Sequence, residues 1–278
     1  MEKIYDAETH FADLGDRKIA YRSYGKGKAV IFVNRFRGTL DTWDPLFIAE
    51  MAKEFNVIVF DYSGIGSSTG SLAPDITIVA KDIKDLDDFL KLDSVIVLGW
   101  SYGGLVAQTA TLLYPNLVTH AVLVGTNPPG QNEIPIEQVF FDAALKPLND
   151  FEDEIVLFFE PKSEASKAAA KASHDRIHKK IEVEKIPSTM DVFQLYFGGG
   201  DTFRDDPLNF REQLKKTKTP ILIISGDHDI SFAVDNWYPI INQMTNAQMI
   251  VYSATGHGPQ HQYPELTAQY IINFVNYI

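Results

Sequence analysis

The segment around Ser101 constrains this chain more than any other part of the sequence. Residues 99–103 read Gly-Trp-Ser-Tyr-Gly, after an apolar run at 94–98 that predicts a buried strand and before residues 104–110, which predict a helix start. A G-x-S-x-G pattern between a strand and a helix is typical of a nucleophile elbow, because its glycines remove side chains where the backbone turns sharply. Such a turn lifts the serine hydroxyl above the edge of the sheet.

A nucleophilic serine needs a neighbouring base and a group that orients this base. Downstream, an apolar strand predicted at 220–225 leads into a loop with two acids, Asp227 and Asp229. A later strand predicted at 249–252 leads into a loop that carries Gly256-His257. We favour His257 over His261 as the base, because His261 precedes the final helix instead of following a strand. The carboxyl ends of these strands form the edge where open α/β sheets bind ligands.

Composition excludes several other functions. The 278 residues carry a formal net charge of −12, which argues against nucleic acid as a partner, since phosphate binding needs a basic face. The chain has no cysteine, so disulfides, thiolate catalysis and cysteine-based zinc sites are excluded. Residues 1–8 lack an apolar stretch, and no apolar run approaches the roughly 18 residues of a membrane span. We therefore expect a cytoplasmic protein without a membrane partner.

Strands and helices alternate along most of the chain. The expected strands lie at 9–14, 18–24, 29–33, 55–60, 95–98, 121–124, 220–225 and 249–252. Helices are expected at about 45–53, 76–90, 104–114 and 264–277, of which the second shows an amphipathic spacing of apolar residues. Alternation of this kind predicts a mostly parallel sheet covered by helices on both faces.

The alternation stops after residue 124. Pro128-Pro129-Gly130 marks a break, and residues 134–205 contain helical stretches without a convincing strand. We call residues 129–206 the helical insertion and expect residues 1–128 and 207–278 to form the core. Lysine-rich residues 163–180 predict a solvated helix face. Gly198-Gly199-Gly200 predicts a hinge or tight turn, because no strand precedes it and no P-loop lysine follows.

Taken together, these segments resemble the α/β-hydrolase superfamily, specifically its cap-bearing serine hydrolases of the carboxylesterase and lactonase type. Residues 99–104 look like the elbow, and 61–68 look like the D-x-R-G-x-G-x-S turn, with Ser63 where arginine is usual. Residues 226–229 look like the G-x-x-D acid loop, and 256–257 look like the histidine loop. The resemblance implies an α/β-hydrolase fold in which the helical insertion forms a cap after the sixth strand.

The resemblance also implies roles for individual residues. Ser101 would be the nucleophile, His257 the general base, and Asp229 the acid that orients His257. The backbone N–H groups of Tyr102 and Phe36 would form the oxyanion hole. Relatives commonly carry His-Gly before the latter position, where this chain has Asn34-Arg35, and a backbone donor survives a change of side chain.

The implied activity is hydrolysis of a small ester, lactone or related acyl substrate through an acyl-enzyme, with no metal or organic cofactor. Perhydrolases, lyases and cofactor-free dioxygenases share the fold and stay open as alternatives, as do amide and carbon–carbon bond hydrolases. A ligand-binding receptor with a vestigial site is a further alternative. The serine at the elbow argues against dehalogenases and epoxide hydrolases, which place aspartate there.

Several other residues are candidates for the substrate pocket. Arg35 adjoins the expected oxyanion loop, where it could meet a substrate carboxylate or an acid of the helical insertion, and Trp100 precedes the nucleophile. Arg37 is better interpreted as solvated surface charge. The insertion is rich in aromatic residues, of which we expect most to pack within it and some to face Ser101: Phe140, Phe141, Phe158, Phe159, Phe193, Tyr196 and Phe197.

Overall fold

Eight strands form a single sheet in the order β1-β2-β4-β3-β5-β6-β7-β8. The computed structural model describes residues 2–278. Met1, the first residue of the segment 1–8 considered above, lies outside the described residues. All neighbouring strands from β4 to β8 run parallel, whereas β2 pairs antiparallel with both β1 and β4. The predicted mostly parallel sheet is therefore confirmed. The strands are β1 (His10–Asp13), β2 (Lys18–Gly25), β3 (Ala29–Val33), β4 (Asn56–Phe60), β5 (Val95–Trp100), β6 (Val118–Val124), β7 (Ile221–Gly226) and β8 (Ala247–Tyr252).

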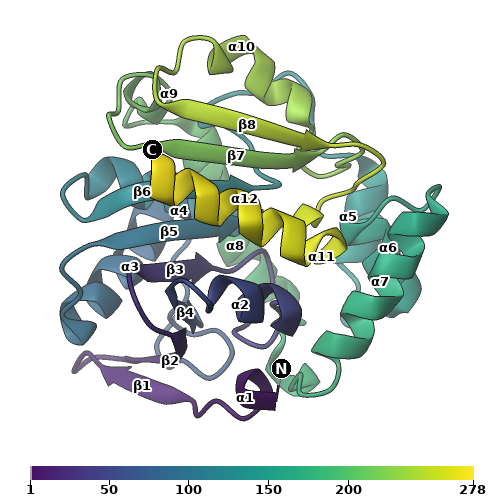
Figure 1. Ribbon diagram of the computed structural model, residues 1–278, viewed down its shortest axis with the longest axis horizontal. Coiled ribbons are helices and arrows are strands. Elements are labelled where there is room, and N and C mark those ends of the chain that lie inside the picture. Colours follow the sequence, from purple (N-terminus) through teal and green to yellow (C-terminus); the bar gives the residue numbers. More distant parts are fainter. Residues whose placement is uncertain (1) are drawn as a thin grey trace.

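Two hydrophobic cores lie on opposite faces of this sheet. Alternate residues of a strand point to opposite faces, so Ile31 and Val33 join one core, while Val30 and Phe32 join the other. The first core contains residues of α3 (Ile76–Leu90) and α4 (Tyr102–Leu113), and the second contains residues of α2 (Pro45–Met51) and α12 (Pro264–Tyr277). Figure 1 shows α2 and α12 together in front of the sheet. The short helices are α1 (Glu2–Tyr5), α10 (Tyr238–Ile241) and α11 (Pro259–Gln262).

The segment between β6 and β7 is helical, as the sequence predicts. Figure 1 shows α6 and α7 beyond the ends toward which β7 and β8 point. The loops that follow the carboxyl ends of the parallel strands lie at this edge of the sheet, and Ser101 follows the carboxyl end of β5. The division of the chain at residues 128 and 207 stays a prediction. The helices between β6 and β7 are α5 (Gln138–Ala144), α6 (Phe151–Phe158), α7 (Glu164–Ile177), α8 (Met190–Asp205) and α9 (Phe210–Leu214).

The prediction of a hinge or turn at Gly198-Gly199-Gly200 is wrong, because all three residues lie inside α8. A Cβ atom on Gly199 would overlap the hydroxyl of Tyr102, and one on Gly198 would lie 2.8 Å from Cβ of Pro74. The glycines therefore let α8 approach the core closely. Glycine lowers helix propensity, and here tertiary packing outweighs that preference.

The interpretation of Arg37 as solvated charge is also wrong, since its side chain is buried and binds the helical insertion. Nε donates a hydrogen bond to the carbonyl of Pro187 (2.7 Å), and Nη2 donates to that of Pro147 (2.7 Å). Nη1 donates to the carbonyls of Ala144 (2.8 Å) and Lys146 (2.7 Å). One guanidinium of the core thus satisfies four backbone carbonyls that follow it by more than 100 residues.

A buried ion pair ties α7 to the core as well. The carboxylate of Asp44, which is fully buried, accepts hydrogen bonds from Nε (2.8 Å) and Nη2 (2.6 Å) of Arg176. The hydroxyl of Ser173 donates a third hydrogen bond to Asp44 (2.8 Å). Residues 163–180 therefore do not present only a solvated face, because one side of α7 is anchored on the loop before α2. A bidentate guanidinium–carboxylate pair fixes orientation as well as distance.

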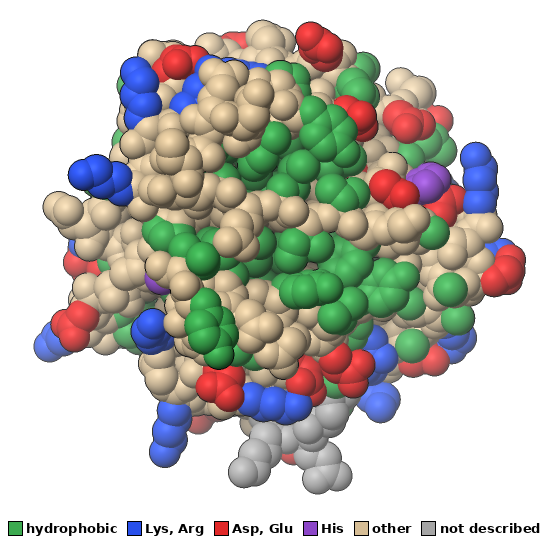
Figure 2. Space-filling view, turned by 45° about the horizontal axis from the view of Figure 1, so that its top comes forward, with side chains coloured by type: hydrophobic (Ala, Val, Ile, Leu, Met, Phe, Trp, Pro, Cys, Tyr) green, Lys and Arg blue, Asp and Glu red, His purple; other side chains and the backbone are tan. Residues whose placement is uncertain are grey.

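The surface mixes charges of both signs. On the face shown in Figure 2, hydrophobic side chains gather near the middle, and acidic and basic side chains are interspersed around them. Among residues 2–278, no helix has both the length and the apolar character needed to cross a bilayer.

Replacing Arg37 tests the link between core and insertion. Arg37→Met keeps much of the side-chain volume but leaves four carbonyls without their donor, so we expect the free energy of unfolding to fall by about 3 kcal/mol. Urea unfolding followed by circular dichroism measures this change. The control is Arg204→Met, since Arg204 is more than half exposed and pairs only with neighbouring acids. Equal losses in the two variants would contradict the anchoring role.

Candidate active site

Ser101 occupies the turn between β5 and α4, and its backbone there is strained. Its φ of 60° and ψ of −124° are values that residues with a side chain rarely adopt. Its amide donates to the carbonyl of Val124 in the neighbouring strand (2.9 Å), and its carbonyl accepts from the amide of Gly104 (2.8 Å). Strain of this kind persists only where the surrounding structure holds it in place. The sharp turn expected from the sequence is therefore present at the serine itself.

The glycines around Ser101 lie where no side chain fits. A Cβ atom on Gly99 would overlap the carbonyl of Gly103, and one on Gly103 would overlap the carbonyl of Val33 at the end of β3. A Cβ atom on Gly104 would lie 2.5 Å from Cβ of Thr126. The turn is thus packed directly against the loops that follow two neighbouring strands, which brings those loops close to Ser101.

The loop after β3 is held by Asn34, the residue that stands where relatives commonly carry histidine. Its side-chain amide donates to the carbonyl of Phe60 (2.6 Å), and its side-chain oxygen accepts from the indole N–H of Trp43 (2.7 Å). Its backbone carbonyl accepts from the hydroxyl of Tyr62 (2.8 Å). Asn34 is buried, so these bonds join three segments of the core and fix the start of the loop that carries Phe36.

Asp61 fixes the other end of the same loop. Its carboxylate accepts hydrogen bonds from the amides of Leu40 (2.7 Å) and Ser67 (2.8 Å). Gly66 has a φ of +60°, and a Cβ atom there would overlap the Asp61 carboxylate. Burial raises the pKa of Asp61 to about 7, while the two backbone N–H groups act in the opposite direction. The D-x-x-G-x-G-x-S turn is therefore a brace for the loop after β3.

Ser63 stands where the resemblance predicts arginine. In this structure Arg17 binds both Ser63 and Asp82. Nε of Arg17 donates to the Ser63 hydroxyl (2.8 Å), which in turn donates to Asp82 (2.7 Å). Nη2 of Arg17 also contacts Asp82 (3.2 Å). Arg17 lies in the turn between β1 and β2, 46 residues before Ser63, so no local sequence pattern reveals this contact.

His257 and Asp229 meet at the carboxyl edge of the sheet. Nδ1 of His257 lies 2.8 Å from Oδ2 of Asp229, and both residues are buried. Oδ1 of Asp229 accepts from the amides of Ser231 (2.8 Å) and Phe232 (2.9 Å), which fixes the carboxylate. The other ring nitrogen, Nε2, is buried and has no hydrogen-bond partner among residues 2–278. An imidazole oriented through Nδ1 with a free Nε2 has the arrangement of a general base.

Contacts on both sides place His257 beside the Ser101 turn. The indole N–H of Trp100, which directly precedes Ser101, donates to the backbone carbonyl of His257 (2.8 Å). The rings of Phe140 and Phe232 lie 6.1 and 5.8 Å from the imidazole, and both residues line the cavity that Ser101 lines. The structure therefore brings the predicted nucleophile, base and acid to one end of the sheet.

The two competing candidates have other partners. Asp227 lies 2.6 Å from Nδ1 of His228 and accepts from the amide of Thr255 (3.2 Å). His261 is buried, and its Nε2 accepts from the amide of Asp44 (3.3 Å). Burial lowers the pKa of His261 to about 4, so it is a neutral acceptor at pH 7.

The two expected oxyanion donors border the same cavity. Tyr102 is the first residue of α4, where helix geometry leaves the amide without an intrahelical acceptor. Phe36 lies in the loop after β3, and its amide donates no hydrogen bond within residues 2–278. Both residues line the cavity together with Ser101. Two unpaired amides beside one hydroxyl form an arrangement that can bind an oxyanion.

The Ser101 cavity is large and mostly apolar. Its volume is about 670 Å³. Among residues 2–278, the charged residues that line it are Asp201 and Arg204, which pair with each other (2.9 Å) and are more than half exposed. The hydroxyls of Tyr102 and Tyr196 are buried and have no partner within the described part of the chain. The aromatic and aliphatic lining includes Phe36, Leu105, Ile136, Phe140, Phe141, Phe197, Phe203 and Phe232.

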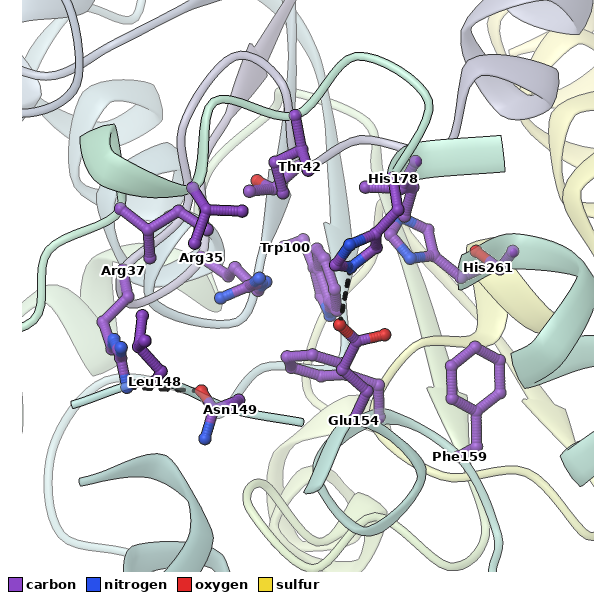
Figure 3. A pocket seen from close by; sticks show the side chains of 16 residues that line it. Arg35, Arg37, Thr42, Trp100, Leu148, Asn149, Glu154, Phe159, His178 and His261 are labelled. Carbon is purple, nitrogen blue, oxygen red and sulfur yellow. Dashed lines mark hydrogen bonds and ion pairs between the residues drawn. The ribbon is translucent and has the colours of Figure 1, made fainter. Parts of the chain in front are cut away.

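Arg35 and Trp100 do not line this cavity, contrary to the prediction. They line a second cavity of about 70 Å³, which Figure 3 shows from close by. The guanidinium of Arg35 lies over the rings of Phe158 (4.5 Å) and Trp100 (5.3 Å) and donates to the carbonyl of Phe36 (2.8 Å). Burial lowers the pKa of Arg35 to about 10. Stacking on two aromatic faces draws the cation away from Ser101.

Six of the seven aromatic residues that the sequence singled out in the helical insertion line one of the two cavities. Four of the seven, Phe140, Phe141, Tyr196 and Phe197, line the Ser101 cavity. Phe158 and Phe159 line the second cavity. The expectation that some of these residues face Ser101 is therefore met, although their spacing in the sequence does not tell which.

Within residues 2–278, the side chains arranged to hold a metal ion are Glu154, His174 and His178. They belong to α6 and to the end of α7. None of the three lines the Ser101 cavity.

Comparisons with known proteins agree with this architecture. A sequence profile of the family described as alpha/beta hydrolase fold matches residues 28–264. The "Putative carbamate hydrolase RutD" of Caulobacter sp. (strain K31) is 25% identical over 97% of this chain and 94% of its own length. The solved alpha/beta hydrolase fold protein from Chitinophaga pinensis superposes with a TM-score of 0.87 at 24% identity, covering 99% of both chains. A meta-cleavage product hydrolase from Pseudomonas fluorescens IP01 superposes with a TM-score of 0.73 at 17% identity, covering 98% of both chains.

Proposed function

Because the chain belongs to the alpha/beta hydrolase fold family, we propose that it is a serine hydrolase acting on an apolar ester, lactone or related acyl substrate. One observation carries the proposal. His257 is oriented by Asp229 through Nδ1, while its buried Nε2, close to the strained Ser101 turn, has no hydrogen-bond partner within residues 2–278. A buried nitrogen that lacks a hydrogen bond costs free energy, and a role in proton transfer explains why it is kept.

The first half of the reaction forms an acyl-enzyme. Oγ of Ser101 attacks the substrate carbonyl carbon while its proton passes to Nε2 of His257. The Nδ1–H group of His257 donates to Asp229, which holds the neutral tautomer and then stabilises the imidazolium. The amides of Tyr102 and Phe36 donate to the oxyanion of the tetrahedral intermediate. The intermediate collapses when Nε2 returns the proton to the leaving oxygen.

The second half releases the acid. A water molecule gives its proton to Nε2 of His257 and attacks the acyl carbon. The second tetrahedral intermediate collapses as the proton returns to Oγ of Ser101, which restores the starting state. Every proton in this cycle passes through Nε2 of His257, so the cycle itself requires no further acid or base.

The lining of the Ser101 cavity supports an apolar, uncharged acyl group. Aromatic and aliphatic side chains dominate the lining, and its charged residues within the described part of the chain, Asp201 and Arg204, are exposed and paired with each other. The free hydroxyls of Tyr102 and Tyr196 can supply polar contacts to a substrate. The names of the relatives span carbamate and meta-cleavage products, so their likeness does not choose the bond that is cleaved.

A matched pair of substitutions tests the catalytic assignment. We expect Asp229→Asn to lower kcat/KM for a p-nitrophenyl ester about 10⁴-fold, because the amide favours the wrong imidazole tautomer. Asp227→Asn changes an acid of the same loop that contacts His228 instead, and we expect a change of less than about threefold. The measurement is steady-state hydrolysis, with Ser101→Ala as the background. Equal losses in the two variants, or no turnover by the unchanged protein, would contradict the proposal.

A second experiment tests the substrate class. We expect p-nitrophenyl pentanoate to be hydrolysed at least about 100-fold more efficiently than mono-p-nitrophenyl glutarate. The two acyl groups have similar length, but the second would bury a carboxylate without a partner, at a cost of several kcal/mol. Comparison of kcat/KM for the two esters measures the difference. Equal efficiencies would show that a cation such as Arg204 reaches the bound acyl group.

A further inference from the structure

Three side chains of the helical insertion converge away from the Ser101 cavity. Glu154 lies on α6, while His174 and His178 lie in and just after the last turn of α7. The two histidines are four residues apart, a spacing that places them on one face of a helix. Nδ1 of His174 lies 2.8 Å from Oε2 of Glu154, and Nε2 of His178 lies 2.9 Å from Oε1. The two imidazole rings stack with centroids 3.9 Å apart.

We propose that Glu154, His174 and His178 bind a divalent transition-metal ion, with zinc as the best match. Two imidazoles and one carboxylate form a donor set typical of zinc, whereas magnesium and calcium prefer oxygen ligands alone. One ligand atom from each residue lies within 4.8 Å of the other two. The site is separate from the catalytic residues, so the inference does not depend on the proposed reaction.

The geometry needs only a small adjustment to hold an ion. Ligand atoms bonded to tetrahedral zinc at about 2.0–2.1 Å are roughly 3.3 Å apart. The two nitrogen–oxygen distances are 2.8 and 2.9 Å, each to a different oxygen of Glu154, so both of these pairs must widen by about half an ångström on this estimate. The rotamers and the helix pairing already point the three groups at one another. Little ordering entropy then remains to be lost when the ion binds.

The partial exposure of the three side chains allows an ion to enter. The side chains of Glu154, His174 and His178 are 20%, 23% and 34% exposed, which leaves a route from solvent and room for a water ligand. Metal ligation requires a deprotonated carboxylate and neutral imidazoles, so we expect the zinc affinity of this site to fall as the pH is lowered.

Neighbouring charges moderate the expected affinity. Figure 3 shows Arg35 across the second cavity from Glu154 and His178, and its positive charge disfavours a second cation. Arg176 of the same helix is neutralised by Asp44, and Lys171 pairs with Asp175 (2.6 Å). With three protein ligands and one nearby cation, we expect weaker binding than at a four-ligand structural zinc site.

Metal binding would stabilise the helical insertion instead of supplying chemistry to Ser101. An ion bonded to Glu154 on α6 and to His174 and His178 on α7 would crosslink these two helices. Because the ring of Phe158 at the end of α6 also meets Trp100 edge to face, the crosslink would reinforce one wall of the second cavity. An ion that binds only the folded chain raises stability with its concentration.

Titration calorimetry with zinc chloride tests the proposal directly. The protein is the full chain without an affinity tag, after treatment with a chelator and its removal. We expect one zinc ion per chain and an unfolding temperature that rises with the zinc concentration. Glu154→Gln and His178→Ala should each weaken zinc binding about 30-fold or more. Bound cobalt should give the visible absorption spectrum of a four-coordinate ion.

His228→Ala is the matched control, because His228 is also a partly exposed histidine paired with an acid, Asp227. We expect its zinc affinity to equal that of the unchanged protein. Absence of saturable binding in the unchanged protein would overturn the proposal. Equal zinc affinities of the Glu154 and His178 variants and the control would also overturn the proposal. The three side chains would then form only a hydrogen-bonded contact between α6 and α7. Circular dichroism at 25 °C verifies that each variant is folded.

Discussion

The backbone conformation of Ser101 is the constraint on which the rest of the site depends. A residue with a side chain held at a φ of 60° and a ψ of −124° stores strain that the neighbouring structure must offset. Glycine at 99, 103 and 104 lets β5, the loop after β3 and the loop after β6 approach the turn without side chains between them. The same close packing sets where Phe36 and Tyr102 lie relative to the serine. The fold thus determines the geometry of the site before any substrate binds.

The loop after β3 shows how the chain keeps that geometry rigid. Asn34 holds its start through three hydrogen bonds, and Asp61 holds its end at Leu40. Between them, Phe36 faces the Ser101 cavity and Arg37 binds four carbonyls of the helical insertion. One short loop therefore connects the expected oxyanion donor to the element that covers it. Donors fixed in this way need little reorganisation when charge develops on the substrate.

The parts of the fold that sequence analysis predicted are those with a local signal. Alternating apolar runs and helices predicted the sheet and its covering helices, and α3 begins and ends where its amphipathic pattern does. The glycine-flanked Ser101 and His257 and the loop acids marked the site because each lies in the loop that follows a strand. Strand ends were less exact: β8 begins at Ala247, two residues before the expected start, because Ala247 and Gln248 do not extend the run of large apolar residues that begins at 249.

The errors share one physical origin, which is contact between distant segments. Gly199 belongs in a helix because α8 packs on Tyr102, and the sequence near 199 contains no trace of that contact. Arg37 is buried because carbonyls more than 100 residues away need a donor. Arg35 turns from Ser101 because Phe158 of α6 offers it a second aromatic face. A short stretch of sequence does not reveal such distant partners. The charge of Arg37 alone therefore suggested an exposed side chain, and the three consecutive glycines alone suggested a turn.

The central claim is that His257 activates Ser101 within this fixed frame. Labelling with a small fluorophosphonate, followed by intact-mass measurement, tests it most directly, because the reagent phosphonylates an activated serine far faster than an ordinary hydroxyl. We predict a single adduct on the unchanged protein and none on Ser101→Ala or His257→Ala. Absence of an adduct on the unchanged protein, or an adduct that persists in Ser101→Ala, would contradict the account.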